Sequence, residues 1–197
     1  MARMSWRRHA LVAALLAALA VPSVAAAEAE TFHRFEVNAI ANYVVTHQCA
    51  DGTTRTTRVQ VIGGQEEETE DGVTESDEFL TVTFRGSDCA GSFNDFGTGE
   101  AEFTFSRSLQ EASVTGTITT FGGRVVTVDM SWEGTGELTT ETNTTIRPGF
   151  TGLFIEKRRD AVATGTVVVN GTTLVDGSTT NAFIRTFEDR NTTTGQA

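Results

Sequence analysis

Apolar and polar residues alternate with a period of two along most of this chain, and this pattern constrains its fold more than any other feature. Strands with one face in the core and one face in water produce such alternation, whereas helices repeat every 3.6 residues. Clear examples run from Phe35 to Val45, from Leu80 to Phe84 and from Val126 to Trp132. No stretch of the sequence shows a sustained helical stripe. The pattern therefore predicts an all-β protein.

Turn dipeptides separate the alternating runs. Asp-Gly, Gly-Gly and Asn-Gly pairs tolerate positive φ angles and close tight hairpins. Together with the runs, they predict a single antiparallel domain of about 8–10 strands, a hairpin meander that closes as a β-barrel or as a β-sandwich. The pattern alone does not separate these two closures. The dipeptides are Asp51–Gly52, Gly63–Gly64, Gly122–Gly123, Asn170–Gly171 and Asp176–Gly177.

Two segments depart from the alternation, and we expect them to be irregular. The segment from Gln65 to Glu78 is strongly acidic, which is typical of a solvated, self-repelling loop. Its carboxylates leave calcium binding open, although the spacing of a dedicated calcium loop is missing. The segment from Ser87 to Gly99 is rich in glycine and contains Cys89. Within it, Phe93 and Phe96 either pack beneath the loop or form a binding lip.

The first 27 residues have the pattern of a cleaved secretory signal peptide. Basic residues from Arg3 to Arg8 precede an apolar run of twelve residues from Ala10 to Val21, and small residues end at Ala27. This run is too short for a membrane span, which needs about 20 residues. We therefore expect residues 1–27 to be a signal and residues 28–197 to be a single all-β domain without a membrane span. That domain would be secreted, or periplasmic if the source has an outer membrane.

The chain is acidic, and removal of the signal would make it more so. It has 15 basic and 26 acidic residues and a net charge of −11, and without Arg3, Arg7 and Arg8 it keeps 12 basic residues and a net charge of −14. This charge argues against nucleic-acid binding, because phosphate backbones need a basic surface. It is best explained by solubility outside the cell. Arginine greatly outnumbers lysine, whose single example is Lys157, and this bias indicates a GC-rich bacterial source.

Cys49 and Cys89 are the two cysteines of the chain. In an oxidising compartment an even number of cysteines predicts a disulfide. On the chain-entropy model, closing this loop of 41 residues would stabilise the fold by about 4 kcal/mol. The alternatives, a metal pair and a reactive thiol, lack a CxxC spacing. His33 and His47 would lie about 46 Å apart along one strand, so we expect no metal site and no cofactor.

The sequence contains no recognisable catalytic constellation. A Gly-x-Ser-x-Gly elbow is absent, and neither histidine has a convincing serine partner. With 26 acidic residues, any chosen pair of carboxylates is uninformative. The question of enzymatic activity stays open, with the balance against it. We expect a non-catalytic extracellular binding or surface-associated module whose ligand is unknown, and the alternatives are a small secreted hydrolase and an apolar-ligand carrier with a barrel interior.

One short stretch resembles other proteins. From Val128 to Leu138 the sequence reads Val-Asp-Met-Ser-Trp-Glu-Gly-Thr-Gly-Glu-Leu, so that a strand ending in tryptophan runs into a Gly-Thr-Gly turn. This stretch resembles a segment that recurs in uncharacterised secreted bacterial β-rich proteins. The resemblance implies a β-rich fold and no particular activity, so it assigns no functional residue.

Overall fold

Nine strands form one antiparallel sheet in the computed structural model, which describes residues 30–70 and 72–193. The predicted signal peptide, residues 1–27, lies outside the described residues. The order across the sheet is β4-β3-β2-β1-β9-β8-β7-β6-β5, and the prediction of an antiparallel all-β fold is confirmed. The strands are β1 (Glu30–Gln48), β2 (Thr54–Glu70), β3 (Val73–Asp88), β4 (Gly91–Glu100), β5 (Glu102–Phe105), β6 (Glu111–Thr119), β7 (Val125–Arg147), β8 (Phe150–Val169) and β9 (Thr172–Thr193).

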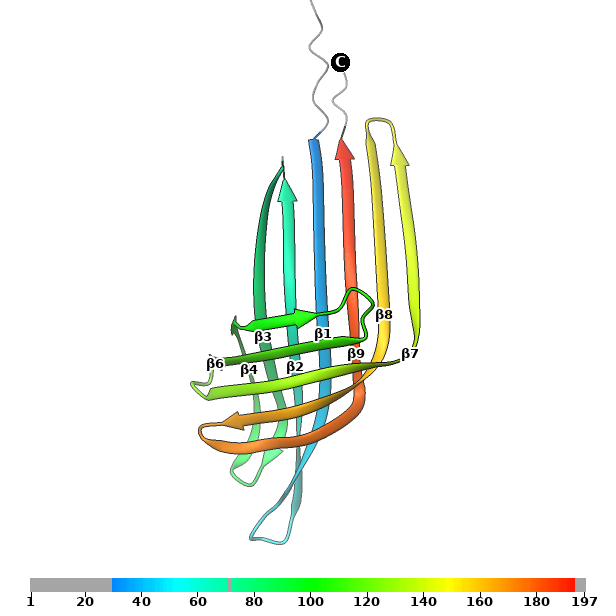
Figure 1. Ribbon diagram of the computed structural model, residues 1–197. Helices are drawn as coiled ribbons and strands as arrows, with labels where there is room; N and C mark the ends of the chain where they lie inside the picture. The colour runs from blue at the N-terminus through cyan, green and yellow to red at the C-terminus, as the bar shows by residue number, and fades with distance from the viewer. Residues whose placement is uncertain (1–29, 71, 194–197) are drawn as a thin grey trace, which may run out of the picture.

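The sheet folds over on itself and does not close into a barrel. Strands β7, β8 and β9 have 23, 20 and 22 residues, and each bends so that its lower part crosses in front of β1–β4 (Figure 1). Strands β5 and β6 continue this crossing layer, and they contact β2 and β3 without sharing a ladder with them. The lower half of the molecule therefore has the two packed layers of a sandwich. The upper half is a single layer.

Irregular pairing marks the level at which the long strands bend. The β7–β8 register shifts between Thr135 and Thr139, and the β8–β9 register shifts between Ala161 and Ala163. An extra residue in one strand of an antiparallel pair bends that strand and increases its twist. Neighbouring strands thus turn together from the upper layer into the crossing layer.

The core fills the space between the two layers. Gly63 on β2 allows β6 to approach closely, because a Cβ atom there would lie 2.7 Å from the Cβ atom of Val114. The Tyr43 hydroxyl donates a hydrogen bond to the carbonyl oxygen of Ala163 at 3.4 Å, which ties β1 to β8. Burial raises the pKa of Tyr43 to about 12. The largest fully buried side chains are Trp132, Phe84, Leu80, Leu109, Met130 and Ile184.

In the single-layer half, aromatic and arginine side chains cover the outer face of β8 and β9, the face turned away from the core. The rings of Phe154 and Phe187 lie 6.0 Å apart between centroids. The Arg158 guanidinium lies 4.0 Å from the ring centroid of Phe183, and that of Arg185 lies 4.6 Å from the ring centroid of Phe187. Each such cation–π contact stabilises an exposed site by about 0.5–1 kcal/mol. These contacts shield a face that has no second layer.

The acidic segment from Gln65 to Glu78 is not a loop, so that prediction was wrong. It completes β2 and begins β3, and Glu70 at the end of β2 pairs with Val73 at the start of β3. An ion pair with Arg34 on β1, 2.6 Å between Nη2 and Oε1, gives Glu66 a partner in the sheet. Because this hairpin belongs to the single layer, both of its faces are wet and it shows no apolar alternation.

The glycine-rich segment from Ser87 to Gly99 was also wrongly predicted to be irregular. Strand β3 continues to Asp88, and β4 begins at Gly91 and pairs with β3 along its whole length. A Cβ atom on Gly97 would lie 2.8 Å from the Cα atom of Thr120. Glycine is therefore required at Gly97 because the backbone at Thr120 packs closely against it, and not because the segment is a loop.

Three of the five turn dipeptides form turns, at Asp51–Gly52, Gly122–Gly123 and Asn170–Gly171. In the last of these, Asn170 and Gly171 have φ angles of 49° and 80°, which a two-residue hairpin turn of the primed type requires. The other two dipeptides, Gly63–Gly64 and Asp176–Gly177, lie inside β2 and β9, so a turn was wrongly predicted there.

A disulfide joins Cys49 to Cys89, as the sequence predicted, with an S–S distance of 2.06 Å and a Cα–Cα distance of 5.4 Å. Cys49 follows β1 and Cys89 lies between β3 and β4. The bond therefore links two neighbouring hairpin turns at one end of the sheet.

Candidate functional site

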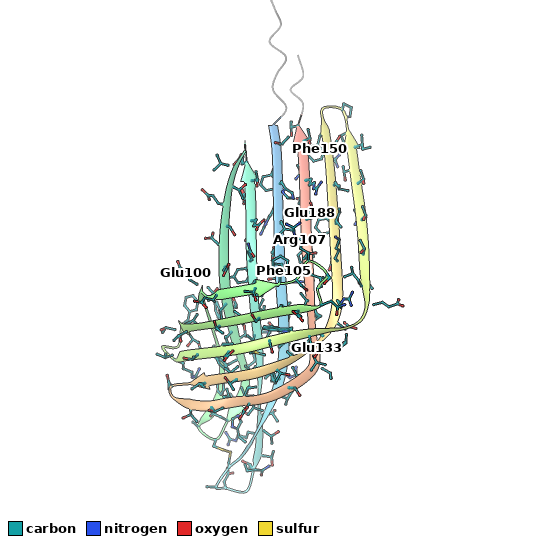
Figure 2. All side chains as sticks on the ribbon, in the orientation of Figure 1. Glu100, Phe105, Arg107, Glu133, Phe150 and Glu188 are labelled. Atoms are coloured by element: carbon teal, nitrogen blue, oxygen red, sulfur yellow. A yellow bond between two sulfur atoms is a disulfide. The ribbon has the colours of Figure 1, made fainter. Side chains whose placement is uncertain are left out.

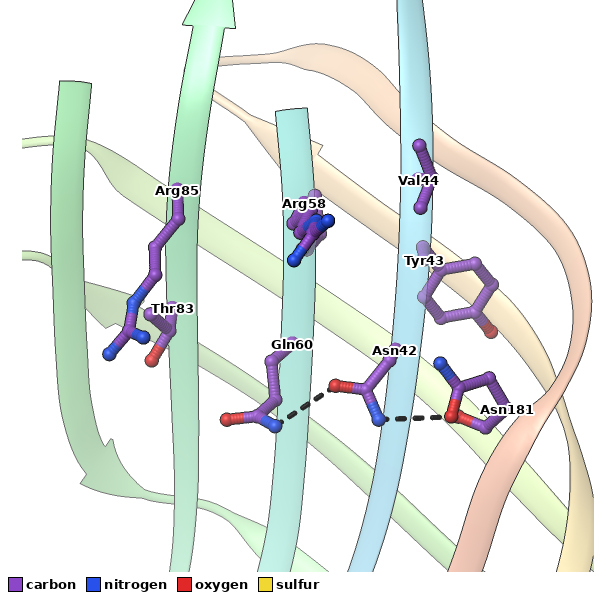
Figure 3. Close-up of a pocket in the computed structure, with 9 residues that line it drawn as sticks. Asn42, Tyr43, Val44, Arg58, Gln60, Thr83, Arg85 and Asn181 are labelled. Atoms are coloured by element: carbon purple, nitrogen blue, oxygen red, sulfur yellow. Dashed lines mark hydrogen bonds between the residues drawn. The ribbon is translucent and has the colours of Figure 1, made fainter. Parts of the chain in front are cut away.

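A polar pocket of about 500 Å³ opens on the outer face of the sheet, over β3, β2, β1 and the start of the β9 bend (Figure 3). Two cross-strand rows form its floor, and both continue onto β4. One row is Asn42, Gln60, Thr83 and Phe96, and the other is Val44, Arg58, Arg85 and Asn94. We call Asn42, Arg58, Gln60, Thr83, Arg85 and Phe96 the outer platform.

The strand period places these side chains on one face. Val59 and Val61 point into the core. Arg58 precedes Val59 and Gln60 lies between the two valines, so both point to the opposite, outer face. Hydrogen bonds then orient the amides: Gln60 Nε2 donates to Asn42 Oδ1 at 2.9 Å, and Asn42 Nδ2 donates to the carbonyl oxygen of Asn181 at 3.3 Å (Figure 3). The platform therefore presents ordered amide groups rather than freely rotating ones.

Two arginines on the platform are direct cross-strand neighbours. Arg58 on β2 pairs with Arg85 on β3, and both side chains are exposed. Within the described part of the chain, no carboxylate lies within salt-bridge distance of either guanidinium. Like charges directly opposite each other destabilise a sheet. In a chain with a net charge of −11, these two adjacent positive charges have no counter-ion among the residues that the structure describes.

The two phenylalanines of the predicted lip lie in different surroundings. Phe96 is 49% exposed, and its ring centroid lies 4.5 Å from that of Phe121, which is 78% exposed. The backbone amide of Phe121 also donates to the carbonyl oxygen of Phe96 at 2.8 Å. Phe93 instead packs against the core beneath Arg124, whose guanidinium lies 4.7 Å from its ring centroid. Phe96 thus extends the outer platform, while binding at a lip of Phe93 and Phe96 stays a prediction.

A buried carboxylate beside the platform connects the two layers. Asp95 accepts hydrogen bonds from Thr120 Oγ1 at 2.7 Å, the Gly122 amide at 2.8 Å and Arg124 Nη1 at 2.6 Å. Burial alone would raise the pKa of Asp95, but these hydrogen bonds and the charge of Arg124 hold it below its usual value. These four residues join β4 to the β6–β7 turn, although β4 does not pair with β6 or β7 in the sheet. We call them the clasp.

A second pocket, of about 330 Å³, lies on the inner face of the single-layer half. Figure 2 shows Phe105, Arg107 and Glu188 close together there. Glu188 accepts a hydrogen bond from His33 at 3.1 Å and forms an ion pair with Arg190. Burial alone would raise the pKa of Glu188, but these two partners lower it. Glu67 also lines this pocket, so its positive groups are interspersed with carboxylates.

The described residues do not bring together the parts of a hydrolase triad. His33 has a carboxylate partner in Glu188, and His47 has a hydroxyl partner in Thr57 at 2.9 Å, but neither histidine contacts both kinds of group. Over residues 30–70 and 72–193, no three His, Cys, Asp or Glu side chains are grouped so that they could hold a metal ion. The same residues include no helix with the length and hydropathy needed to cross a membrane.

Arg58 and Arg85 were not predicted from the sequence as site residues. Their proximity follows from the β2–β3 register, which depends on where the chain turns. Asp71–Gly72 is itself a turn dipeptide, and a turn between Glu70 and Val73 places Arg58 opposite Arg85. That signal was present but lay within the segment predicted to be a loop.

No protein-family model matches the chain, and no curated protein matches it. A search of solved structures finds a likeness to the crystal structure of an AttH protein from Nitrosomonas europaea, with a TM-score of 0.29 and 10% sequence identity. The match covers 83% of this chain and 52% of that one, so the chain spans about half the length of this neighbour. A likeness at this level supports no inference about fold or function.

Proposed function

We propose that the protein is a non-catalytic extracellular binding module that recognises an acidic, hydroxyl-rich ligand, such as an acidic glycan, on its outer platform. The observation that carries this proposal is the adjacent pair Arg58 and Arg85, which has no carboxylate partner among the described residues. Guanidinium groups bind carboxylates and sulfates through paired, charge-assisted hydrogen bonds. A ligand acid group would neutralise the two charges that repel each other in the free protein.

The neighbouring side chains favour a sugar over a simple inorganic anion. Asn42 and Gln60 supply amide donors and acceptors, and Thr83 supplies a hydroxyl. These groups suit the many hydroxyls of a glycan. Phe96 adds an exposed aromatic surface in the same row, on which the apolar face of a sugar ring could pack. The row from Phe96 to Asn42 crosses four strands, or about 14 Å, so the ligand would be an oligosaccharide.

The acidity of the whole chain does not prevent this binding. On the same face, the nearest acidic group along β2 is Glu66, eight residues from Arg58, or about 27 Å along the strand. At physiological ionic strength, charges are largely screened beyond about 8 Å. A ligand on the platform would therefore experience mainly the two arginines.

Isothermal titration calorimetry with trigalacturonate and with its neutral methyl ester tests the proposal. We expect the acid to bind and the ester to bind at least about tenfold more weakly, because only the acid can neutralise the arginines. Arg58→Met and Arg85→Met should each weaken binding of the acid about tenfold, the equivalent of 1.4 kcal/mol. Neither variant should melt at a lower temperature than the wild type, because each removes a repulsion.

Arg107→Met is the matched control, since it removes one positive charge at the inner pocket. It should leave the affinity for trigalacturonate unchanged. Equal affinities for the acid and its ester would contradict the proposal, and so would an equal loss in Arg107→Met and Arg58→Met.

The extracellular location is part of the same proposal. It is supported by the sequence of residues 1–27 and by the Cys49–Cys89 disulfide, a bond that persists in oxidising compartments. Export can be checked by N-terminal sequencing of protein recovered outside the producing cell. A mature chain that begins at Glu28 is the expected product.

A further inference from the structure

The free edge of β7 is unpaired over the upper half of the sheet. Strand β6 pairs with β7 only between Val125 and Glu133, so from Thr139 to Arg147 the strand has β8 on one side and no strand of the described residues on the other. All of these residues are exposed, and Ile146 is 77% exposed. Such an edge offers unpaired backbone N–H and C=O groups to another strand.

The opposite edge of the same layer is protected. From Val73 to Glu78, strand β3 pairs with β2 on one side and has no described strand on its outer side, because its pairing with β4 begins at Phe79. That segment contains Glu75, Asp77 and Glu78, so two copies of it would repel each other. The β7 edge, Thr-Thr-Glu-Thr-Asn-Thr-Thr-Ile-Arg, has one acidic and one basic residue and lacks such protection.

We propose that the protein self-associates by antiparallel pairing of the segment Glu141–Arg147 with the same segment of a second copy. A two-fold axis would place Thr144 opposite Thr144 of the second copy. In this register Glu141 lies opposite Arg147 of the second copy, and the symmetry creates the same ion pair twice. Ile146 lies opposite Thr142 of the second copy, and two β-branched side chains pack well on a sheet face.

Among the residues that the structure describes, Glu141 and Arg147 both lack an oppositely charged partner in the monomer. Glu141 lies directly opposite Glu156 on β8, a like-charge pair. Within the described ranges, neither Glu141 nor Arg147 has an ion-pair partner. Arg147 of the second copy would supply the positive charge that Glu141 lacks. Charge complementarity of the edge with itself therefore identifies a second copy as its partner.

The contact is small, which defines the kind of dimer expected. Pairing from Glu141 to Arg147 involves one strand from each copy, whereas stable interfaces bury about 1,200–2,000 Å² in total. The dimer should therefore form reversibly and depend on protein concentration. Strands β2 and β3, with Arg58 and Arg85, lie on the other side of β1 and β9 from β7, so pairing leaves the outer platform free.

Sedimentation velocity over a wide concentration range tests this inference on the purified protein. The wild type should shift from monomer to dimer as its concentration rises. Glu141→Arg and Arg147→Glu should each stay monomeric at concentrations where the wild type is dimeric, because each creates two like-charge pairs. The double variant E141R/R147E should recover the dimer, because both ion pairs return with their signs exchanged.

Glu75→Arg provides the matched control, since it makes the same charge change at the other free edge. It should dimerise like the wild type. A wild type that stays monomeric throughout would overturn the inference. A double variant no better than the single variants would do the same, as would dissociation by Glu75→Arg.

Discussion

Replacing Asp95 with alanine is expected to lower the free energy of unfolding by about 3 kcal/mol, because hydrogen bonds to a charged acceptor contribute about 1.5–3 kcal/mol each. The Asp95 side chain is 5% exposed and accepts three hydrogen bonds. Alanine would leave the Thr120 hydroxyl, the Gly122 amide and the Arg124 guanidinium without their acceptor. Urea unfolding followed by tryptophan fluorescence measures the loss, because Trp132 lies in the core between the layers.

Two further variants separate the clasp from a general effect of losing a carboxylate. Asp95→Asn keeps the shape and one oxygen acceptor, so it should lose less stability than alanine. Asp129→Ala removes an exposed aspartate from β7 and should change the free energy of unfolding by less than about 0.5 kcal/mol. If Asp129→Ala and Asp95→Ala lower the free energy of unfolding by the same amount, the hydrogen bonds of the clasp do not stabilise the fold.

The clasp should also weaken in acid. The pKa of Asp95 is lower in the folded protein than in the unfolded chain, so its stabilisation is complete above the unfolded value of about 4. That stabilisation is lost as the pH falls through the lower, folded pKa, because the folded carboxylate must then take up a proton. The difference in unfolding free energy between wild type and Asp95→Asn should therefore shrink below about pH 4. A difference that stays constant down to acid pH would contradict the role of ionised Asp95.

The second large effect should come from the disulfide. The double variant Cys49→Ser/Cys89→Ser is expected to lose about 4 kcal/mol of unfolding free energy, because its unfolded chain regains the freedom of a long loop. The two cysteines are 40 residues apart in sequence. Urea unfolding of the variant and of the oxidised wild type gives the difference directly.

Reduction provides an independent measurement of the same bond. The wild type in reductant should match the serine variant, and the serine variant should not respond to reductant. A serine variant as stable as the oxidised wild type would show that residual structure in the unfolded chain already restricts this loop.

The sequence predicted strands correctly where apolar side chains alternate against the core. From Val126 to Trp132, every second residue is buried between the two layers, so the alternation is explicit. The segment from Gln65 to Glu78 lies in the single-layer half, where polar residues occupy both faces. Hydrophobic periodicity carries no signal there, and the charge pattern led to a loop prediction. A strand stabilised mainly by its neighbours in the sheet is difficult to recognise from its own residues.

The candidate site depended on strand register, which local patterns do not determine. A turn at Gly63–Gly64 would have placed Arg58 opposite Thr69, whereas the observed turn places it opposite Arg85. Phe96 was singled out from the sequence as an apolar residue in a polar segment, but its place in a row with Thr83 and Gln60 was not. Individual residues could therefore be nominated from the sequence, while their combination required the fold.

The direct pairing of Glu30 with Thr193 has a mechanical consequence. These residues begin β1 and end β9, so a force that separates the two ends pulls perpendicular to both strands. It would load the β1–β9 hydrogen bonds one pair at a time, from Glu30–Thr193 toward Ala41–Ala182, rather than all at once. The sheet should thus unzip at low force from this end. The hairpin turns joined by Cys49–Cys89 do not lie on this β1–β9 ladder and would be loaded only after it has opened.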